Sequence, residues 1–397
     1  MRLTLDAALS LPSDGTKGTL IGRAWLPGPL SGGPAGPAVV ALRADGVWDI
    51  TGLAPTVSEL LNAPNPLTLA RATKGAKRIG TVAEVLANSP ADKHDPGKPY
   101  FLAPCDLQAV KAAGVTFANS MLERVIESKA KGDATRQDAL RRELNREIGA
   151  DLSAVRPGSI EADKLKQALI LRDLWSPYLE VGIGPYAEIF TKCPPMASVG
   201  TGAEIGLHPD SSWNNPEPEI VLAVNARGEV KGATLGNDVN LRDFEGRSAL
   251  LLGKAKDNNA SSAVGPFIRL FDETYSIDDV RRADVNLSVR GEDQFLLDAK
   301  SSMAKISRDP LELVAHTAGA AHQYPDGFVL FLGTMFAPTK DRGAKGSGFT
   351  HHPGDIVTIA TPTLGSLVNR VTTSDKAPPW TFGSGALMRN LAQRGLL

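Results

Sequence analysis

Residues 214–224 decide the fold, and they read Asn-Asn-Pro-Glu-Pro-Glu-Ile-Val-Leu-Ala-Val. Successive side chains of a β-strand point to opposite faces, so Glu217 and Glu219 share one face and Ile220 falls on the other. Pro218 has no backbone N–H and is tolerated only at a sheet edge or at the start of a strand. The pattern therefore predicts a strand that begins at two carboxylates and continues with apolar residues.

The two carboxylates are the first indication of a metal site. Side by side they repel each other unless a cation lies between them, and hard oxygen ligands select Mg²⁺, Mn²⁺ or Ca²⁺. Taken alone, such a pair is more often an exposed strand edge. The next predicted strand, residues 231–238, ends at Asp238 and adds a third carboxylate. Arg242 follows where it could pair with a carboxylate ligand. Lys256 could add positive charge near a bound anion or be an ordinary surface lysine.

The rest of the chain has the composition of a turn-rich protein with short strands. It contains 39 Gly and 28 Pro among 397 residues, which is above the usual share. Ala44-Asp45-Gly46 predicts a hairpin turn, and Thr56 and Thr81 are cap signals for two short helices. The pattern predicts strands at 19–26, 38–50, 218–224, 231–238, 283–289, 327–332 and 355–361, and helices at 57–62, 81–89, 243–254 and 309–322.

Charge and hydropathy exclude several classes of protein. The chain carries 43 Lys and Arg against 44 Asp and Glu, which argues against a nucleic-acid binder or a basic membrane-binding patch. No apolar stretch approaches the roughly 18 to 20 residues of a membrane-spanning helix. Cys105 and Cys193 are too few for a disulfide framework, and Met1–Asp6 does not resemble a secretory leader. We therefore expect a soluble protein of the reducing cytoplasm.

Several further blocks of sequence carry a resemblance to a known family. They are Pro185-Tyr-Ala-Glu-Ile-Phe-Thr-Lys192, Glu217-Pro-Glu219, Gly236-Asn-Asp-Val-Asn-Leu-Arg-Asp243, Lys256, Gly265-Pro-Phe267, Gly333-Thr334, Pro353-Gly-Asp355 and Leu364-Gly-Ser-Leu-Val-Asn369. In their order and spacing, over roughly residues 106–371, they resemble the fumarylacetoacetate hydrolase superfamily. The resemblance covers about two thirds of the chain.

This resemblance implies a fold, a cofactor and an assembly. The fold is α+β and mostly β: a mixed β-sheet roll forms the catalytic domain over residues 106–397, and a smaller α+β domain over residues 1–105 precedes it. The cofactor is Mg²⁺, or Mn²⁺, held by Glu217, Glu219 and Asp238. The substrate is a small 2-keto acid, and the assembly is a homodimer or homotetramer.

The same resemblance and the residue types suggest which groups contact the substrate. Lys256 and Thr334 would contact its carboxylate or keto oxygen, with Arg242 in support, and Gly333 lets the backbone come close to a ligand. Further hydrogen bonds to sugar hydroxyls could come from loop residues, although a plain loop explains each about equally well. These loop candidates are Asn258, Asn259 and Trp213-Asn214-Asn215. The Gly-rich stretch 346–353, which includes His351, we interpret as an ordinary polar loop rather than a mobile lid.

One departure from the family bears on the reaction. Members that hydrolyse carbon–carbon bonds typically carry Tyr-x-x-His-x-x-Glu, in which the His and its Glu partner activate water. The corresponding stretch here is residues 117–123, which read Phe-Ala-Asn-Ser-Met-Leu-Glu. Glu123 is kept, but Ser120 stands where the His would be, and a serine is no base near neutral pH without a partner. The sequence therefore weakens the hydrolase interpretation in particular.

A metal site that binds a 2-keto acid can also catalyse a reaction that needs no activated water, because the cation makes the C3 protons more acidic. With a hydroxyl on C4, loss of that proton expels the hydroxyl by β-elimination. Glu123 could move the proton, and it or Ser120 could assist the departing hydroxide, with Lys256 as a third catalytic group. The superfamily contains dehydratases of 2-keto-3-deoxy sugar acids, and this chain is most similar to the pentonate-specific members, whose product is 2-oxoglutarate semialdehyde.

We therefore predict a Mg²⁺-dependent hydro-lyase that dehydrates a 2-keto-3-deoxy pentonate. The alternative is a hydrolase that uses the same metal site to bind a 2,4-diketo-3-deoxy sugar acid and cleaves it to pyruvate and a hydroxy acid. A non-catalytic relative that only binds a keto acid is a third possibility. The intact carboxylates and Lys256 argue against it.

Overall fold

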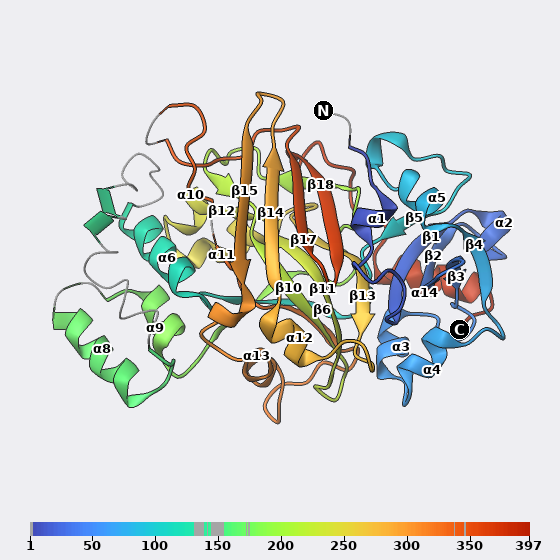
Figure 1. The fold of residues 1–397 in the computed structure, drawn as a ribbon, viewed down its shortest axis with the longest axis horizontal. Coiled ribbons are helices and arrows are strands. Elements are labelled where there is room, and N and C mark those ends of the chain that lie inside the picture. The colour runs from blue at the N-terminus through green and yellow to red at the C-terminus, as the bar shows by residue number, and fades with distance from the viewer. Residues whose placement is uncertain are drawn as a thin grey trace.

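The computed structural model describes residues 3–130, 139–140, 142–143, 155–171, 173, 175–336, 338–344 and 347–397. In this part of the chain, two mixed β-sheets pack against each other, and helices gather at both ends of the molecule (Figure 1). Both sheets combine antiparallel neighbours with one parallel pair, β16–β6 in the larger and β18–β8 in the smaller. The expected α+β, mostly β class is therefore confirmed.

The larger sheet contains eleven described strands in the order β4-β3-β2-β1-β13-β11-β10-β16-β6-β7, with β5 paired to β1. Its strands are β1 (Leu20–Leu26), β2 (Gly36–Arg43), β3 (Gly46–Asp49), β4 (Lys77–Gly80), β5 (Tyr100–Leu102), β6 (Ala109–Gly114), β7 (Glu188–Cys193), β10 (Pro218–Val224), β11 (Val230–Asp238), β13 (Ser262–Leu270) and β16 (Phe328–Phe331). Strand β10 lies between β11 and β16 and begins at Pro218, so the missing N–H costs no ladder hydrogen bond inside the sheet.

The smaller sheet follows the order β15-β14-β17-β18-β8. Its strands are β8 (Glu204–Leu207), β14 (Asp284–Arg290), β15 (Leu296–Ser302), β17 (Ile356–Thr361) and β18 (Gly365–Thr373), and a separate two-stranded ribbon pairs β9 (Asn214–Asn215) with β12 (Asn240–Leu241). The main apolar core lies between the two sheets, with Ile220 and Leu222 from β10 packed in one cluster with Leu287 and Ile359. Period-two alternation thus directs one face of β10 into this core, while the other face carries Glu219 and then Val221 and Ala223, which pack in two further apolar clusters.

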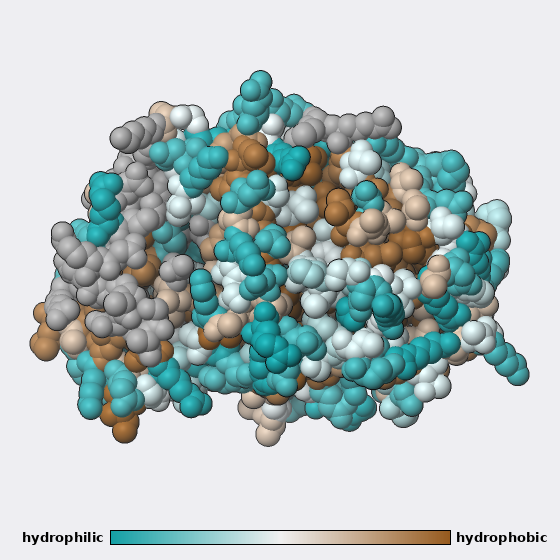
Figure 2. Space-filling model, viewed as in Figure 1, coloured by the Kyte–Doolittle hydropathy of each residue, from teal (hydrophilic) through white to brown (hydrophobic). Residues whose placement is uncertain are grey.

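The helices lie mostly at the two ends of the sheets (Figure 1). They are α1 (Ala7–Ser10), α2 (Gly28–Ser31), α3 (Val57–Asn62), α4 (Pro66–Arg71), α5 (Val82–Ala87), α6 (Ala118–Ala130), α8 (Ile160–Leu171), α9 (Pro177–Ile183), α10 (Arg242–Glu245), α11 (Leu252–Lys256), α12 (Ile277–Arg282), α13 (Pro310–Thr317) and α14 (Ser384–Gln393). Short 3₁₀ turns occur at Ala91–Lys93, Ala249–Leu251 and Met303–Lys305. None of the described helices is both long and apolar enough to cross a membrane. Hydrophilic side chains are spread over much of the face shown in Figure 2, between smaller apolar patches.

The local predictions succeed where the pattern is strong. Each predicted strand is present within a few residues, and the turn at Ala44–Asp45 divides 38–50 into the hairpin β2–β3. Thr81 caps α5 with a capping box, as its position predicts. Strands β6, β7, β8, β13, β15 and β18 were not predicted, because their alternation is interrupted by Gly, Pro and charged residues.

Two predicted helices are shorter than expected. The helix predicted over 243–254 is wrong as a single element: α10 ends at Gly246, and the chain starts again at Ser248, whose side chain accepts from the N–H of Leu250. The helix predicted over 309–322 ends at Thr317, because Ala318 is extended and Gly319 pairs with His322 instead. In both places a turn-forming residue overrides the apolar periodicity.

The predicted division between residues 105 and 106 remains a prediction. The larger sheet runs across it, because β1 pairs with β13. Helix α14, near the end of the chain, returns to the first hundred residues, where Asn390 donates to the carbonyl of Ala35. The two predicted parts are therefore joined by backbone pairing as well as by the chain.

Candidate metal centre and active site

Three carboxylates meet where β10 begins and β11 ends. The strands are antiparallel with Pro218 opposite Asn237, and the N–H of Asp238 donates to the carbonyl of Glu217 (3.1 Å). The side chains of Glu217, Glu219 and Asp238 are buried, and each offers an oxygen within 4.8 Å of the others. The strand register therefore brings together the three residues that the resemblance names as metal ligands.

The chemistry of this donor set fits a divalent cation. Three buried carboxylates in close contact are hard ligands of the kind that Mg²⁺ and Mn²⁺ prefer. The pKa of Glu219 is raised well above its usual value, first by burial and then by the negative charges of Asp238 and Glu217. A bound cation would relieve this repulsion. The N–H of Gly333 donates to Glu219 Oε2 (2.7 Å) and so orients that carboxylate.

Two buried lysines partly offset the negative charge. The Lys256 ammonium lies 2.5 Å from Glu217 Oε2 and 2.9 Å from Asp238 Oδ2, and Lys192 Nζ lies 2.8 Å from Asp238 Oδ1. Burial acts to lower the pKa of Lys256, but the charges of Asp238 and Glu217 outweigh it and raise that pKa above its usual value. Lys256 is therefore a protonated member of the cluster and not a surface lysine.

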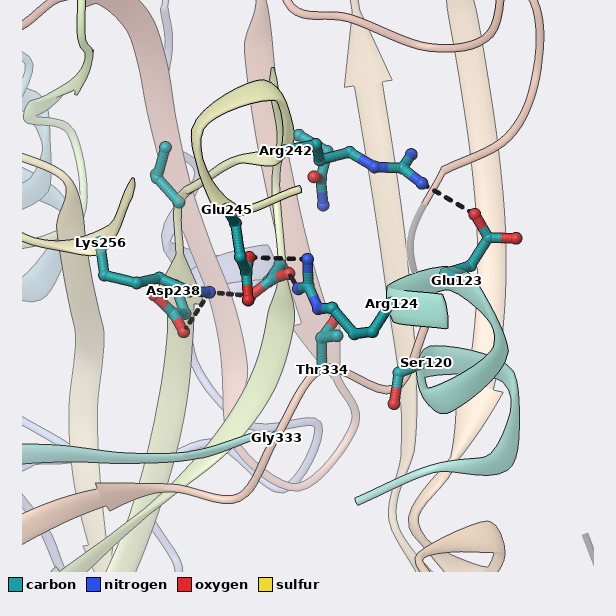
Figure 3. Close-up of polar contacts among 12 residues, drawn as sticks. Ser120, Glu123, Arg124, Asp238, Arg242, Glu245, Lys256, Gly333 and Thr334 are labelled. Atoms are coloured by element: carbon teal, nitrogen blue, oxygen red, sulfur yellow. Dashed lines mark hydrogen bonds and ion pairs between the residues drawn. The ribbon is translucent and has the colours of Figure 1, made fainter. Parts of the chain in front are cut away.

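Arg124 is a further basic member that the sequence analysis missed. Its guanidinium pairs with Glu217, and its Nη1 lies 2.8 Å from Glu245 Oε2. Arg124 lies on α6 directly after Glu123, and the two side chains diverge: Arg124 turns toward the carboxylates and Glu123 toward Arg242 (Figure 3). Helix α6 and the β10–β11 pair are far apart in sequence, so no local pattern indicated this contact.

Glu123, Arg242 and Ser120 lie on the same side of the site. Arg242 Nη2 donates to Glu123 Oε2 (2.8 Å), so its ion pair is with the predicted base, whereas Arg124 pairs with Glu217. The Ser120 hydroxyl donates to the carbonyl of Phe117 (2.8 Å) and points away from Glu123 in Figure 3. The catalytic roles of Glu123 and Ser120 remain predictions, and Arg242 is placed to position Glu123 rather than a metal ligand.

Gly333 and Thr334 lie beside Glu219, at one end of the site. Gly333 has a φ of 99°, and a Cβ there would lie 2.0 Å from Thr116 Oγ1, so both the backbone conformation and the space require glycine. Thr334 is buried and its hydroxyl donates to the carbonyl of Phe336 (3.0 Å). Both residues therefore lie beside a candidate ligand, and their contact with substrate remains a prediction.

Asn259, the remaining candidate for substrate contact, lies in a different environment. Its amide donates to the carbonyls of Ser374 and Pro378, both at 3.1 Å. Together with Trp25 and Trp380 it lines a separate cavity of about 250 Å³. The structure therefore lends no support to its contact with a substrate at the carboxylates.

Strand β7 contributes two charged residues to which the sequence analysis assigned no role. Glu188, Phe190 and Lys192 share one face by period two, and the Phe190 ring lies 5.5 Å from Lys256 Nζ. Burial raises the pKa of Glu188, against the lowering effect of Arg124 and Lys256. The alternation of charged and apolar residues within the block 185–192 was the signal that could have identified them.

His351 is the centre of a second buried polar network. Its Nδ1 lies 3.0 Å from Asp355 Oδ2, and Arg342 Nη1 lies 2.6 Å from the same oxygen. The His351 N–H donates to Asn214 Oδ1 (3.1 Å), which ties the 347–353 segment to β9. For His351 the interpretation as ordinary loop polarity is wrong, because the side chain is buried; Gly346, at the start of the predicted loop, lies outside the described residues.

Residues 189–372 match the model of the fumarylacetoacetate (FAA) hydrolase C-terminal family. The chain is 31% identical over 184 residues to a 2-dehydro-3-deoxy-D-arabinonate dehydratase of Saccharolobus solfataricus, covering 46% of this chain and 58% of that protein. It is 29% identical over 196 residues to a probable 2-keto-3-deoxyxylonate dehydratase of Haloferax volcanii, covering 49% of this chain and 64% of that protein. The matches thus span less than two thirds of either curated relative.

Solved structures show the same fold. A 2-keto-3-deoxy-D-arabinonate dehydratase complexed with magnesium and 2,5-dioxopentanoate aligns with a TM-score of 0.59 at 19% identity, over 89% of this chain and 99% of that one. A fumarylacetoacetate hydrolase from Exiguobacterium antarcticum aligns with a TM-score of 0.54 at 16% identity, over 89% and 99%. The fold, the family model over residues 189–372 and the sequence similarity thus agree in a likeness to the fumarylacetoacetate hydrolase family.

Proposed function

We propose that this protein is a Mg²⁺-dependent dehydratase that converts a 2-keto-3-deoxy pentonate to 2-oxoglutarate semialdehyde. The observation that carries the proposal is the buried triad Glu217, Glu219 and Asp238, whose ligand oxygens lie within 4.8 Å of one another beside the buried Lys256. The names of the curated relatives support the same reaction class. So does the neighbour with magnesium and 2,5-dioxopentanoate bound, because 2,5-dioxopentanoate is the proposed product.

The three carboxylates would hold the cation, which supplies a positive charge that polarises the substrate's keto group and acidifies C3. Lys256 adds a fixed positive charge close to Glu217 and Asp238, where negative charge develops during the reaction. Thr334 and the backbone at Gly333 would orient the substrate's carboxylate at the Glu219 end. Glu123, held by Arg242, would take the proton from C3.

The proposed reaction balances without an oxidant. The C3–H bond breaks and its proton goes to the Glu123 carboxylate, then the C4–O bond breaks and the hydroxyl leaves as water once it takes a proton. Two proton shifts, from C5 to C3 and from the C5 hydroxyl to C4, then convert the C5 alcohol into the aldehyde. The Ser120 hydroxyl is not required in this sequence, which agrees with its hydrogen bond to Phe117.

Product analysis tests this function. The protein is incubated with 2-keto-3-deoxy-xylonate and 2-keto-3-deoxy-arabinonate in the presence of Mg²⁺, and the products are identified by mass. Loss of one water, abolished by a chelator and restored by Mg²⁺, is the expected result. Pyruvate formed only from the 2,4-diketo analogue would overturn the proposal in favour of the hydrolase. Binding of either keto acid without turnover would indicate a non-catalytic relative.

Assembly and cellular location remain predictions beside this function. A homodimer or homotetramer is expected from the family resemblance, and light scattering coupled to size-exclusion chromatography measures it directly. A reducing cytoplasmic setting is consistent with Cys105 and Cys193, which are both buried free thiols.

A further inference from the structure

The strand pair that carries the carboxylates continues beyond them. Strands β9 and β12 pair with Asn215 opposite Asn240, and β10 and β11 pair with Pro218 opposite Asn237. These two pairings have the same register, so a single antiparallel ladder runs through both ribbons. The metal triad therefore lies in the middle of the ladder and not at its end.

Period-two alternation places one row of polar side chains along the carboxylate face of this ladder. The residues of the opposite parity, Val239 and Leu241, belong to the apolar core. The row consists of Glu219, Glu217 and Asn215 on one side and Asp238 and Asn240 on the other. Trp213 directly precedes β9 and Arg242 begins α10, and the Arg242 guanidinium lies 4.4 Å from the centre of the Trp213 indole ring.

Asn215, Asn240 and Trp213 are buried, and each has a polar side-chain atom without a partner among the described residues, although Asn215 Nδ2 donates to the carbonyl of Pro216 (2.9 Å). Asn215 and Asn240 are 0% exposed and Trp213 is 2% exposed. Asn215 Oδ1, both polar side-chain atoms of Asn240 and Trp213 Nε1 have no hydrogen-bond partner among the described residues. Each buried polar atom left without a partner costs about 1–3 kcal/mol. These four atoms on neighbouring residues indicate a binding position for a polar group of a ligand.

The neighbouring Asn214 differs from these residues in its hydrogen bonding. It lies on the same strand with the opposite parity, and its side chain is fully engaged: Oδ1 accepts from the N–H of His351 (3.1 Å) and Nδ2 donates to Ser211 Oγ (3.2 Å). Asn215 is equally buried, but its Oδ1, on the face of the carboxylates, has no partner among the described residues.

The amide pair and the substrate anchors lie on opposite sides of the carboxylates. The N–H of Gly333 donates to Glu219, so Gly333 and Thr334 lie at one end of the row, and Asn215 and Asn240 lie on the other side of Glu217 and Asp238. Two residues along a strand span about 6.7 Å. That distance is comparable to the length of an extended chain from a keto group to a hydroxyl three carbons away.

We propose that Asn215 and Asn240, with the indole N–H of Trp213, form a subsite for the terminal hydroxyl of the sugar acid. This inference rests on the proposed function, because it takes the keto end of the substrate to lie at the carboxylate triad. An amide both donates and accepts, as a hydroxyl does, and the pair carries no charge. The subsite therefore selects a neutral hydroxyl-bearing tail over a methyl group, which leaves the amides unpaired, and over a second carboxylate, which would lie close to Glu217 and Asp238.

Binding of two unreactive ligands tests the subsite without relying on turnover. The ligands 2-oxopentanoate and 5-hydroxy-2-oxopentanoate differ only in the terminal hydroxyl, and neither has the C4 hydroxyl that elimination needs. Their dissociation constants are measured by calorimetry with Mg²⁺ present. We expect the wild type to bind the hydroxylated ligand about 10-fold more tightly, in line with a hydrogen bond that also satisfies buried groups. In Asn240→Leu we expect the two affinities to become equal.

Two further variants keep the test independent of folding. Asn286→Leu makes the same change at an exposed position of β14 and should leave the ratio at its wild-type value. Asn240→Ala serves if the leucine variant does not fold, with unfolding midpoints recorded for all. An equal affinity of the wild type for both ligands, or a ratio unchanged in Asn240→Leu, overturns the subsite and indicates buried water only.

The outcomes separate this inference from the proposed function. If the pentonates are not dehydrated but the hydroxyl preference is present and depends on Asn240, the dehydratase assignment fails and the subsite stands. If the pentonates are dehydrated and the preference is absent, the subsite fails and the function stands. If the pentonates are not dehydrated and the protein binds neither ligand in the presence of Mg²⁺, both are overturned.

Discussion

Replacing Lys256 by Met should destabilise the protein in a way that Mg²⁺ partly reverses. Met retains much of the lysine stem but removes a charge that lies within 3 Å of both Glu217 and Asp238. The ammonium and both carboxylates are buried, and removing one partner from a buried ion pair costs about 3–5 kcal/mol. Because Lys192 and Arg124 still pair with these carboxylates, we expect the lower end of that range, about 3 kcal/mol.

Mg²⁺ should reduce this loss because it supplies positive charge at the same carboxylates. A ligand that binds only the folded state stabilises it by about 2.7 kcal/mol at 100 times its dissociation constant. Without Lys256 the cluster is more negative, so the variant should bind the cation more tightly than the wild type does. The stability gap should therefore be largest in chelator and should narrow as Mg²⁺ is added.

Urea unfolding followed by circular dichroism, in chelator and over a Mg²⁺ titration, measures both effects. Lys254→Met is the matched control, because Lys254 lies one half-turn away on the same helix, is exposed, and contacts His208 at 3.0 Å. It should change stability by less than about 0.5 kcal/mol, as surface substitutions usually do. A Lys256→Met protein as stable as this control in chelator, or an equal Mg²⁺ effect on variant and wild type, would refute the electrostatic reasoning.

Two further predictions concern the carboxylates of Glu123 and Glu188. Glu123→Gln should lower kcat by about 100-fold or more while Mg²⁺ affinity stays unchanged, since an amide cannot take the C3 proton; near-normal kcat would show that another group is the base. Glu188→Gln should be more stable than wild type at pH 7 and equal to it near pH 4. Burial raises the pKa of Glu188 in the folded state, so its contribution to stability is full below the unfolded pKa and is lost as pH rises through the folded one. Urea unfolding at both pH values measures this, and a pH-independent difference would contradict it.

Local patterns predicted much of the fold because they depend only on neighbours in the chain. The period-two run at 218–224 is observed as β10, and the Thr81 signal is observed as a capping box. The predicted helix over 243–254 failed because Gly246 and Ser248 interrupt it, although the apolar spacing continues. Strands such as β13 and β18 went unrecognised because Gly, Pro or charged residues interrupt their alternation.

Some residues of the candidate site were likewise predicted from the sequence, and others were not. Glu217, Glu219 and Asp238 are recognisable in the sequence, because two short strands with a turn between them place these side chains on one face. Arg124, Lys192 and Glu188 were missed as site members. Their roles depend on which face of α6 and β7 meets the β10–β11 pair, and that is settled by long-range packing.

The sequence by itself indicated the candidate donor set: three carboxylates at strand positions whose parity is local and whose oxygen chemistry selects a hard cation. Tertiary structure alone decided how that charge is balanced, because Lys192 and Arg124 come from elements distant in sequence. It also gave Arg242 the partner Glu123, and it left Asn215 Oδ1 and the Asn240 amide buried without partners among the described residues while Asn214 was satisfied. Alternation along a strand is a property of neighbouring residues, whereas charge compensation and desolvation depend on every group that packs around a site.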